Sequence, residues 1–91
     1  MNHEDHTWLE QVHSENDQLK HAARARAAVD QALGVLTARF HLPPDRGLDV
    51  LRALSQHLDE QLPDVATDIM QWGLGQPLRP AVEEELDNLV H

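Results

Sequence analysis

The chain has 91 residues and a formal net charge of -9, and 41% of its residues are hydrophobic but only 3% aromatic. This length provides one hydrophobic core, which excludes a multidomain enzyme, and the aliphatic composition favours helices. Because the chain contains no cysteine, disulfides, zinc–thiolate sites and cysteine nucleophiles are excluded.

The acidic residues are concentrated at the two ends of the chain. Residues 1–18 hold five acids and no Lys or Arg, a net charge of -5, whereas residues 75–91 carry -3 and residues 19–74 only -1. The whole molecule therefore attracts nucleic acid and anionic lipid poorly at long range, although its near-neutral middle has clustered bases. The polar amino end and the lack of about 18 consecutive apolar residues predict a cytoplasmic protein with no membrane partner.

A long first helix is predicted from Asp5 to about Arg39, because this segment contains no proline and, before Gly34, no glycine. At about 1.5 Å per residue the helix would be roughly 50 Å long, too long for one side of a monomer of this size. It also carries a heptad pattern of ten positions, of which only Glu15 and Arg26 are polar. These positions are Trp8, Val12, Glu15, Leu19, Ala22, Arg26, Val29, Leu33, Leu36 and Phe40.

The heptad pattern predicts that the long helix meets a second copy of the chain. We assign the dimer seam to Trp8, Val12, Leu19 and Ala22, and we expect a homodimer. Residues 1–18 form the acidic amino-terminal part of this helix.

Prolines and glycines set the limits of the next two helices. Pro43 and Pro44 break the first helix, and a second helix is predicted to run from about Pro44 to His57. Pro63 suits the first turn of a third helix, which ends at Gly73. The residues expected to face the core are Leu48, Leu51, Leu54 and Leu58 in the second helix, and Val65, Ala66, Ile69 and Met70 in the third.

A last, weakly amphipathic helix is predicted after Pro80, with Ala81, Val82, Leu86, Leu89 and Val90 on its apolar side. The fold class is therefore all-α: a small three-helix bundle with a long N-terminal coiled-coil helix and a short C-terminal helix. We assign the bundle to residues 19–74 and a helical extension to residues 75–91.

Neither catalysis nor a metal site is indicated. His3 and His6 lie one helical turn apart and His13 lies seven residues further on, but a structural metal site needs three or four rigid ligands and chain ends are usually exposed. The chain has no Gly-rich phosphate loop, and Ser14 and Ser55 have no recognisable acid–base partners. We predict neither an enzyme nor a bound cofactor.

Residues 24–70 contain a series of motifs in a fixed order. Its pieces are Arg26, Gln31-Ala32-Leu33-Gly34-Val35-Leu36, Arg39, Leu51-Arg52, Ser55-Gln56, Leu62 and Asp64-Val65-Ala66. This series resembles the ANTAR family, the RNA-binding module of bacterial antitermination regulators, without a gap over about 47 residues. The resemblance implies a dimer that binds paired stem-loops in RNA and regulates transcription antitermination. Relatives usually carry a receiver or sensor domain ahead of this module, and we expect neither here.

The resemblance, together with the positions of the bases, identifies candidate RNA-binding residues. They are Lys20, Arg24, Arg26 and Arg39 in the first helix, and Arg52 and Gln56 in the second. Arginines can hold phosphates or stack on an unpaired base. A purely structural role is the alternative, because Arg26 can pair with Asp30 or with a partner's acid, and Arg52 follows Asp49 by three residues. For Gly34 we expect close helix packing.

Several family residues that would touch RNA are replaced in this sequence. Leu33 and Gln61 stand where the family has Lys, Asp59 where it usually has Asn, and Pro63 where it often has Arg. Because phosphate contacts supply much of the affinity for nucleic acid, these changes should weaken binding. The alternative function is therefore a degenerate module that has lost RNA and acts as a protein-interaction subunit, for example in a heterodimer with a full-length relative.

Overall fold

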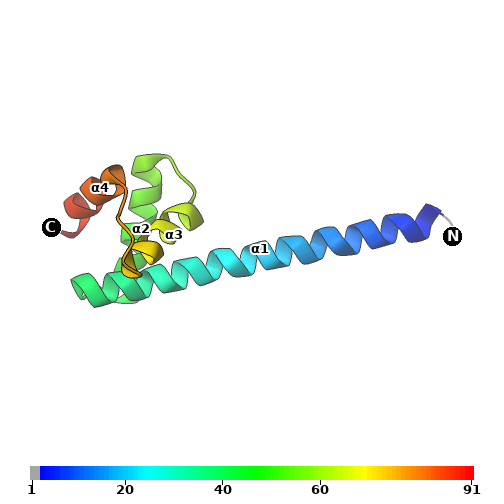
Figure 1. Ribbon diagram of the computed structural model, residues 1–91, viewed down its shortest axis with the longest axis horizontal. Helices are drawn as coiled ribbons and strands as arrows, with labels where there is room; N and C mark the ends of the chain where they lie inside the picture. The colour runs from blue at the N-terminus through cyan, green and yellow to red at the C-terminus, as the bar shows by residue number, and fades with distance from the viewer. Residues whose placement is uncertain (1–2) are drawn as a thin grey trace.

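The computed structural model describes the backbone of residues 3–91 and the side chains of residues 19–91. Over this part the chain forms four helices and no strand: α1 (His3–Phe40), α2 (Pro44–Leu58), α3 (Leu62–Gly73) and α4 (Pro80–Val90). Helix α1 is a long rod, and the other three helices gather at its carboxyl end (Figure 1). The predicted all-α fold with a long first helix and a short last helix is confirmed.

The carboxyl-terminal half of α1 supplies one wall of the core. Ala28, Ala32 and Leu36 are buried there, since residues four apart lie on one face of a helix. Helix α1 ends at Phe40, and His41 takes a left-handed backbone conformation with φ of 58°. The chain can then turn sharply into α2, where Pro44 occupies the first turn without losing a helical hydrogen bond.

Helices α2 and α3 close the core against α1. Gly47 of α2 is buried, and a Cβ atom at this position would lie 3.1 Å from a methyl carbon of Leu33. The fully buried residues of the two helices include Leu51, Leu54, Val65, Ala66 and Ile69. Helix α3 runs in the same direction as α1, because Pro63 lies beside Arg24 and Gly73 lies against Val35.

Helix α4 packs antiparallel on α2 and completes the core with Val82 and Leu86. The Nδ1 atom of His57 lies 3.0 Å from a carboxylate oxygen of Glu85. Before α4 begins, Arg79 donates hydrogen bonds to Asp68 (2.9 Å) and Glu60 (2.7 Å). The hydrogen bonds to Glu60 and Asp68 raise the pKa of Arg79, and the three side chains, here named the Arg79 clamp, connect the start of α4 to α3.

The structure divides the predicted heptad pattern into two parts. Leu36 is fully buried in the protomer's own core, and Val29, Leu33 and Phe40 pack against the same core. These positions therefore pack, wholly or in part, against the protomer's own core. The assigned seam residues Leu19 and Ala22 are exposed, whereas the side chains of Trp8 and Val12 lie outside the described residues.

Two smaller sequence predictions need correction. Gly34 is exposed and has no atom within 4 Å of an added Cβ, so the expectation of close helix packing was wrong. The glycine that permits a close approach is Gly73, where a Cβ would meet Val35 of α1 at 2.4 Å. Met70 is only half-buried, and Ala81 is exposed.

Candidate nucleic-acid interface

The candidate bases of α1 are spread along the helix. Lys20, Arg24, Arg26 and Arg39 are all exposed. At a rise of about 1.5 Å per residue, Lys20 and Arg39 are separated by about 28 Å along the axis. At 3.6 residues per turn, Lys20, Arg24 and Arg39 fall within an arc of about 100°, whereas Arg26 projects from the opposite side of this helix. The structure therefore forms no compact cluster from these four residues.

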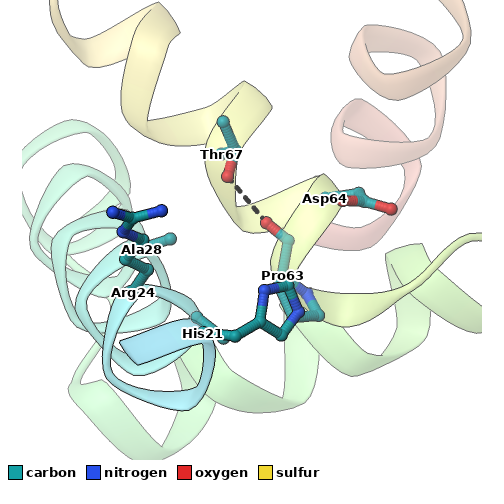
Figure 2. Close-up of a pocket in the computed structure, with 7 residues that line it drawn as sticks. His21, Arg24, Ala28, Pro63, Asp64 and Thr67 are labelled. Carbon is teal, nitrogen blue, oxygen red and sulfur yellow. Dashed lines mark hydrogen bonds between the residues drawn. The ribbon is translucent and has the colours of Figure 1, made fainter. Parts of the chain in front are cut away.

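Arg24 borders a cleft between α1 and the amino end of α3 (Figure 2). The cleft has a volume of about 190 Å³ and is lined by His21, Arg24, Ala25, Ala28, Pro63, Asp64 and Thr67. The hydroxyl of Thr67 donates to the carbonyl of Pro63 at 2.8 Å and is thus already engaged. Figure 2 shows the Asp64 carboxylate pointing away from Arg24, so Arg24 is the cationic group at this cleft.

Arg39 has an aromatic partner at the other end of the bundle. Its guanidinium carbon lies 4.1 Å from the centroid of the Trp72 ring, a cation–π contact. Trp72 in turn stacks on Phe40, with ring centroids 6.1 Å apart. To bind RNA, the Arg39 guanidinium would have to contact it while still lying over Trp72, or leave the Trp72 ring.

Arg52 and Gln56 lie together on α2. They are four residues apart, exposed, and on the side of α2 opposite its buried residues. Like Lys20 and Arg24 on α1, they form a pair that helical geometry brings onto one face within a single turn. Arg52 accordingly presents its charge to solvent beside an amide that can both donate and accept hydrogen bonds.

The local ion pairs considered as an alternative role for the motif arginines do not form within the chain. No salt bridge joins Arg26 to Asp30 or Arg52 to Asp49, although all four side chains are described. Both arginines thus keep their charge available for another partner. Arg79, which was not singled out by its sequence context, is instead engaged in the Arg79 clamp.

One polar residue near a candidate base was missed from the sequence, and a second cleft lies apart from the candidate bases. His21 lines the cleft with Arg24, and its position one turn before Arg24 was the signal that could have identified it. Arg46 borders a second cleft of about 320 Å³ between α2 and α4, together with Asp49, Val50, Ala53 and Leu89. Spacing along the chain gives no signal for that cleft, because Leu89 comes from the carboxyl-terminal helix.

The described residues contain no helix that is long and apolar enough to cross a membrane. Within the same residues no three His, Asp or Glu side chains come together in a way that could hold a metal ion. The side chains of His3, His6 and His13 lie outside this description.

Comparison with known families places the chain in one of them. The family model of the ANTAR domain matches residues 17–70, which is more than half of the chain. The matched segment contains the carboxyl-terminal part of α1, all of α2 and most of α3, and α4 lies outside it. No curated protein and no solved structure matches the chain.

Proposed function

Because this chain belongs to the ANTAR family of RNA-binding antitermination regulators, we propose that it binds hairpin RNA as a homodimer and regulates transcription in the bacterial cytoplasm. ANTAR is a regulatory RNA-binding domain and not an enzyme family. The observation that carries the proposal is the match over residues 17–70, because Lys20, Arg24, Arg39 and Arg52 all lie inside it. We keep the division into residues 1–18, 19–74 and 75–91 as part of this proposal.

In this proposal exposed bases hold the phosphate backbone. Lys20, Arg24 and Arg52 are exposed, and Arg24 and Arg52 form no salt bridge with any described carboxylate. Each can donate to a phosphate. With Arg39 the bases of α1 span about 28 Å along the helix, which suits contacts with several phosphates of one duplex stem. Gln56, one turn from Arg52, is the candidate for a base edge or a ribose hydroxyl in the loop.

Fluorescence anisotropy tests this proposal directly. The RNA carries two short hairpins, and binding is measured at low and moderate salt. We expect Arg24→Ala and Arg52→Ala each to weaken binding at least threefold and to reduce its salt dependence, since each removes one phosphate contact. Arg46→Ala is the matched control, because it removes the same charge from an exposed position outside the proposed set and should change binding less than twofold.

A scrambled RNA of equal length separates specific binding from simple charge attraction. Equal affinity for hairpin and scrambled RNA at low salt, or equal effects of Arg24→Ala, Arg52→Ala and Arg46→Ala, would contradict the proposal.

The second candidate function is a protein-interaction subunit that no longer binds RNA. It is favoured by the net charge of -9 and by the engagement of Arg39 with Trp72. Both features weaken attraction to a polyanion. Affinity capture from the source cell tests this reading: recovery of a full-length ANTAR relative, together with no RNA binding, would support a heterodimer.

A further inference from the structure

The carboxyl ends of α1 and α3 meet at one end of the bundle and bring aromatic side chains together there. The two helices run in the same direction and Gly73 lies against Val35, so Trp72 lies beside the last turn of α1. The Trp72 ring stacks on Phe40, with ring centroids 6.1 Å apart and an interplanar angle of 27°. The ring of His91 meets Phe40 edge-on, with centroids 6.3 Å apart. Three segments that are distant in the sequence thus supply one aromatic cluster.

Arg39 lies on the solvent side of this cluster. Trp72 and Phe40 are half-buried and pack against the core, whereas Arg39 is exposed. The guanidinium carbon of Arg39 lies 4.1 Å from the centroid of the Trp72 ring. Arg39 forms no salt bridge with any described carboxylate. The aromatic ring therefore holds the guanidinium in place, and no acid among the described residues neutralises its charge.

A guanidinium supported in this way can bind a second flat group. Guanidinium groups are planar and stack on nucleobases as they stack on aromatic rings. Trp72 occupies one side of the Arg39 guanidinium, and the exposure of Arg39 leaves surface on the side away from the ring. Because the long side chain is already held against Trp72, less conformational entropy is lost when a base stacks on it. Arg39, Trp72 and Phe40, here named the Arg39 platform, form a preorganised stacking surface.

The chemistry of the Arg39 platform selects its ligand. A positive charge on an aromatic cluster suits a group that has both a π face and a nearby negative charge, as a nucleotide does. Bases within a stem are already stacked and paired, so only an unpaired base offers a free face. Arg39 lies about 22 Å along α1 from Arg24. A hairpin whose stem phosphates contact Arg24 can therefore present its loop to the platform.

We propose that the Arg39 platform binds one unpaired base of the RNA loop, stacked on the Arg39 guanidinium. The inference rests on the proposed function and deepens it, because it assigns a site for the unpaired part of the hairpin. Trp72 is a positioning residue in this site, since it acts through Arg39. Trp72 also lies outside residues 17–70, so the complete platform extends beyond the segment that matches the family.

Fluorescence anisotropy with two hairpins tests the platform. Both RNAs have the same stem and the same number of phosphates, but one loop carries abasic nucleotides in place of bases. The wild-type chain should bind the intact loop about tenfold more tightly than the abasic loop, as expected for one stacked base. Arg39→Lys keeps the positive charge but has no planar group. It should reduce the preference to less than about threefold, mainly by weakening binding of the intact loop.

Trp72→Leu tests the positioning role. Leucine keeps an apolar side chain against the core but removes the ring, so the preference for the intact loop should fall although Arg39 is unchanged. The salt dependence of binding should stay as in the wild type, because no phosphate contact is removed. Arg46→Lys is the matched control, since it makes the same charge-conserving exchange at an exposed position outside the platform, and it should keep the full preference. Circular dichroism of each variant verifies that the helix content is retained.

The possible outcomes separate this inference from the proposed function. Equal binding of both hairpins by the wild-type chain overturns the platform and leaves the proposed function standing. A preference that persists in Arg39→Lys, or in folded Trp72→Leu, overturns the platform as well. Leu74 is 79% exposed close to Trp72, so a protein is the other possible occupant. An unchanged preference with a raised dimer Kd in Trp72→Leu would assign the cluster to a protein interface and overturn the proposal. Failure of the wild-type chain to bind either hairpin contradicts the proposed function itself and this inference with it.

Discussion

The two halves of α1 carry one heptad pattern and bury it in different ways. After about residue 28 the pattern faces α2 and α3, and Leu36 has no exposed surface. Before that point Leu19, at an equivalent apolar position, is 68% exposed within the protomer. Periodicity thus specifies that a face is to be covered but not whether the chain itself or another copy covers it.

The largest expected effect is on the free energy of unfolding, which should respond differently to substitutions in the two halves of α1. Leu36→Ala removes a fully buried side chain and should lower the free energy of unfolding by about 2–5 kcal/mol, because the cavity cannot collapse fully. Leu19→Ala should change the stability of the isolated bundle by less than about 0.5 kcal/mol, since the side chain is exposed there. Urea unfolding at low protein concentration, monitored by Trp72 fluorescence in a Trp8→Phe background, measures both.

The same two variants should reverse their order in a dimerisation assay. Leu19→Ala should raise the dimer Kd, while Leu36→Ala, if still folded at low temperature, should leave it nearly unchanged. A large loss of bundle stability in Leu19→Ala would show that the amino-terminal half of α1 also packs within the protomer, and the comparison would fail.

The next effect concerns the contact between α1 and α3. Gly73→Ala brings a Cβ into collision with a methyl carbon of Val35, so the Val35 side chain or one of the two helices must shift. We expect a loss of about 1–3 kcal/mol in the free energy of unfolding, as for other overpacked sites. Val35→Ala in the same chain removes the obstructing methyl groups and should recover part of the loss in thermal unfolding. An unaltered melting temperature in Gly73→Ala would contradict the close approach of α1 and α3.

Much of the fold follows from local signals in the sequence. Pro44, Pro63 and Pro80 each lie within the first turn of the helix that follows, and Gly73 is the last residue of α3. These boundaries were predicted closely because proline and glycine act through their own backbone geometry. The family resemblance was carried by motifs within one segment and was confirmed by the match to residues 17–70.

Contacts between distant segments could not be predicted in this way. The sequence separates Arg39 widely from Trp72, and Arg79 from Glu60, so no spacing rule connects them. The positions of Gly34 and Gly73 show the same limit, since a glycine's own sequence context does not reveal whether another helix passes over it. The six candidate RNA-binding residues stay a prediction, because a surface on one protomer does not identify its ligand.

A smaller effect is expected at the Arg79 clamp. Arg79→Gln removes the ion pairs with Glu60 and Asp68 and should loosen the attachment of α4 while leaving α1 and α3 folded. Amide hydrogen exchange should therefore become faster in α4 than in α3. Hydrogen bonds raise the pKa of Arg79, so its contribution is complete below its unfolded pKa and lost only at strongly alkaline pH. The exchange difference should accordingly be constant between about pH 6 and 8.

Arg52→Gln is the matched control for this comparison, because Arg52 is an exposed arginine on the side of α2 away from the core, with no salt bridge to a described carboxylate. Equal acceleration of exchange in the two variants would indicate a general charge effect and would contradict a specific clamp.

The smallest expected effect returns to the exposed side of α1. Gly34→Ala adds a methyl group where no atom lies within 4 Å, and alanine is the better helix former by about 0.5–1 kcal/mol. The variant should therefore be more stable in urea by about that amount. Ala38→Gly, one turn away and also exposed, should be less stable by a similar amount. Gly34→Ala could also weaken the dimer while the bundle gains stability. That result would mean that the added methyl group obstructs the partner's helix. The dimer, and not the protomer, would then explain why this position has no side chain.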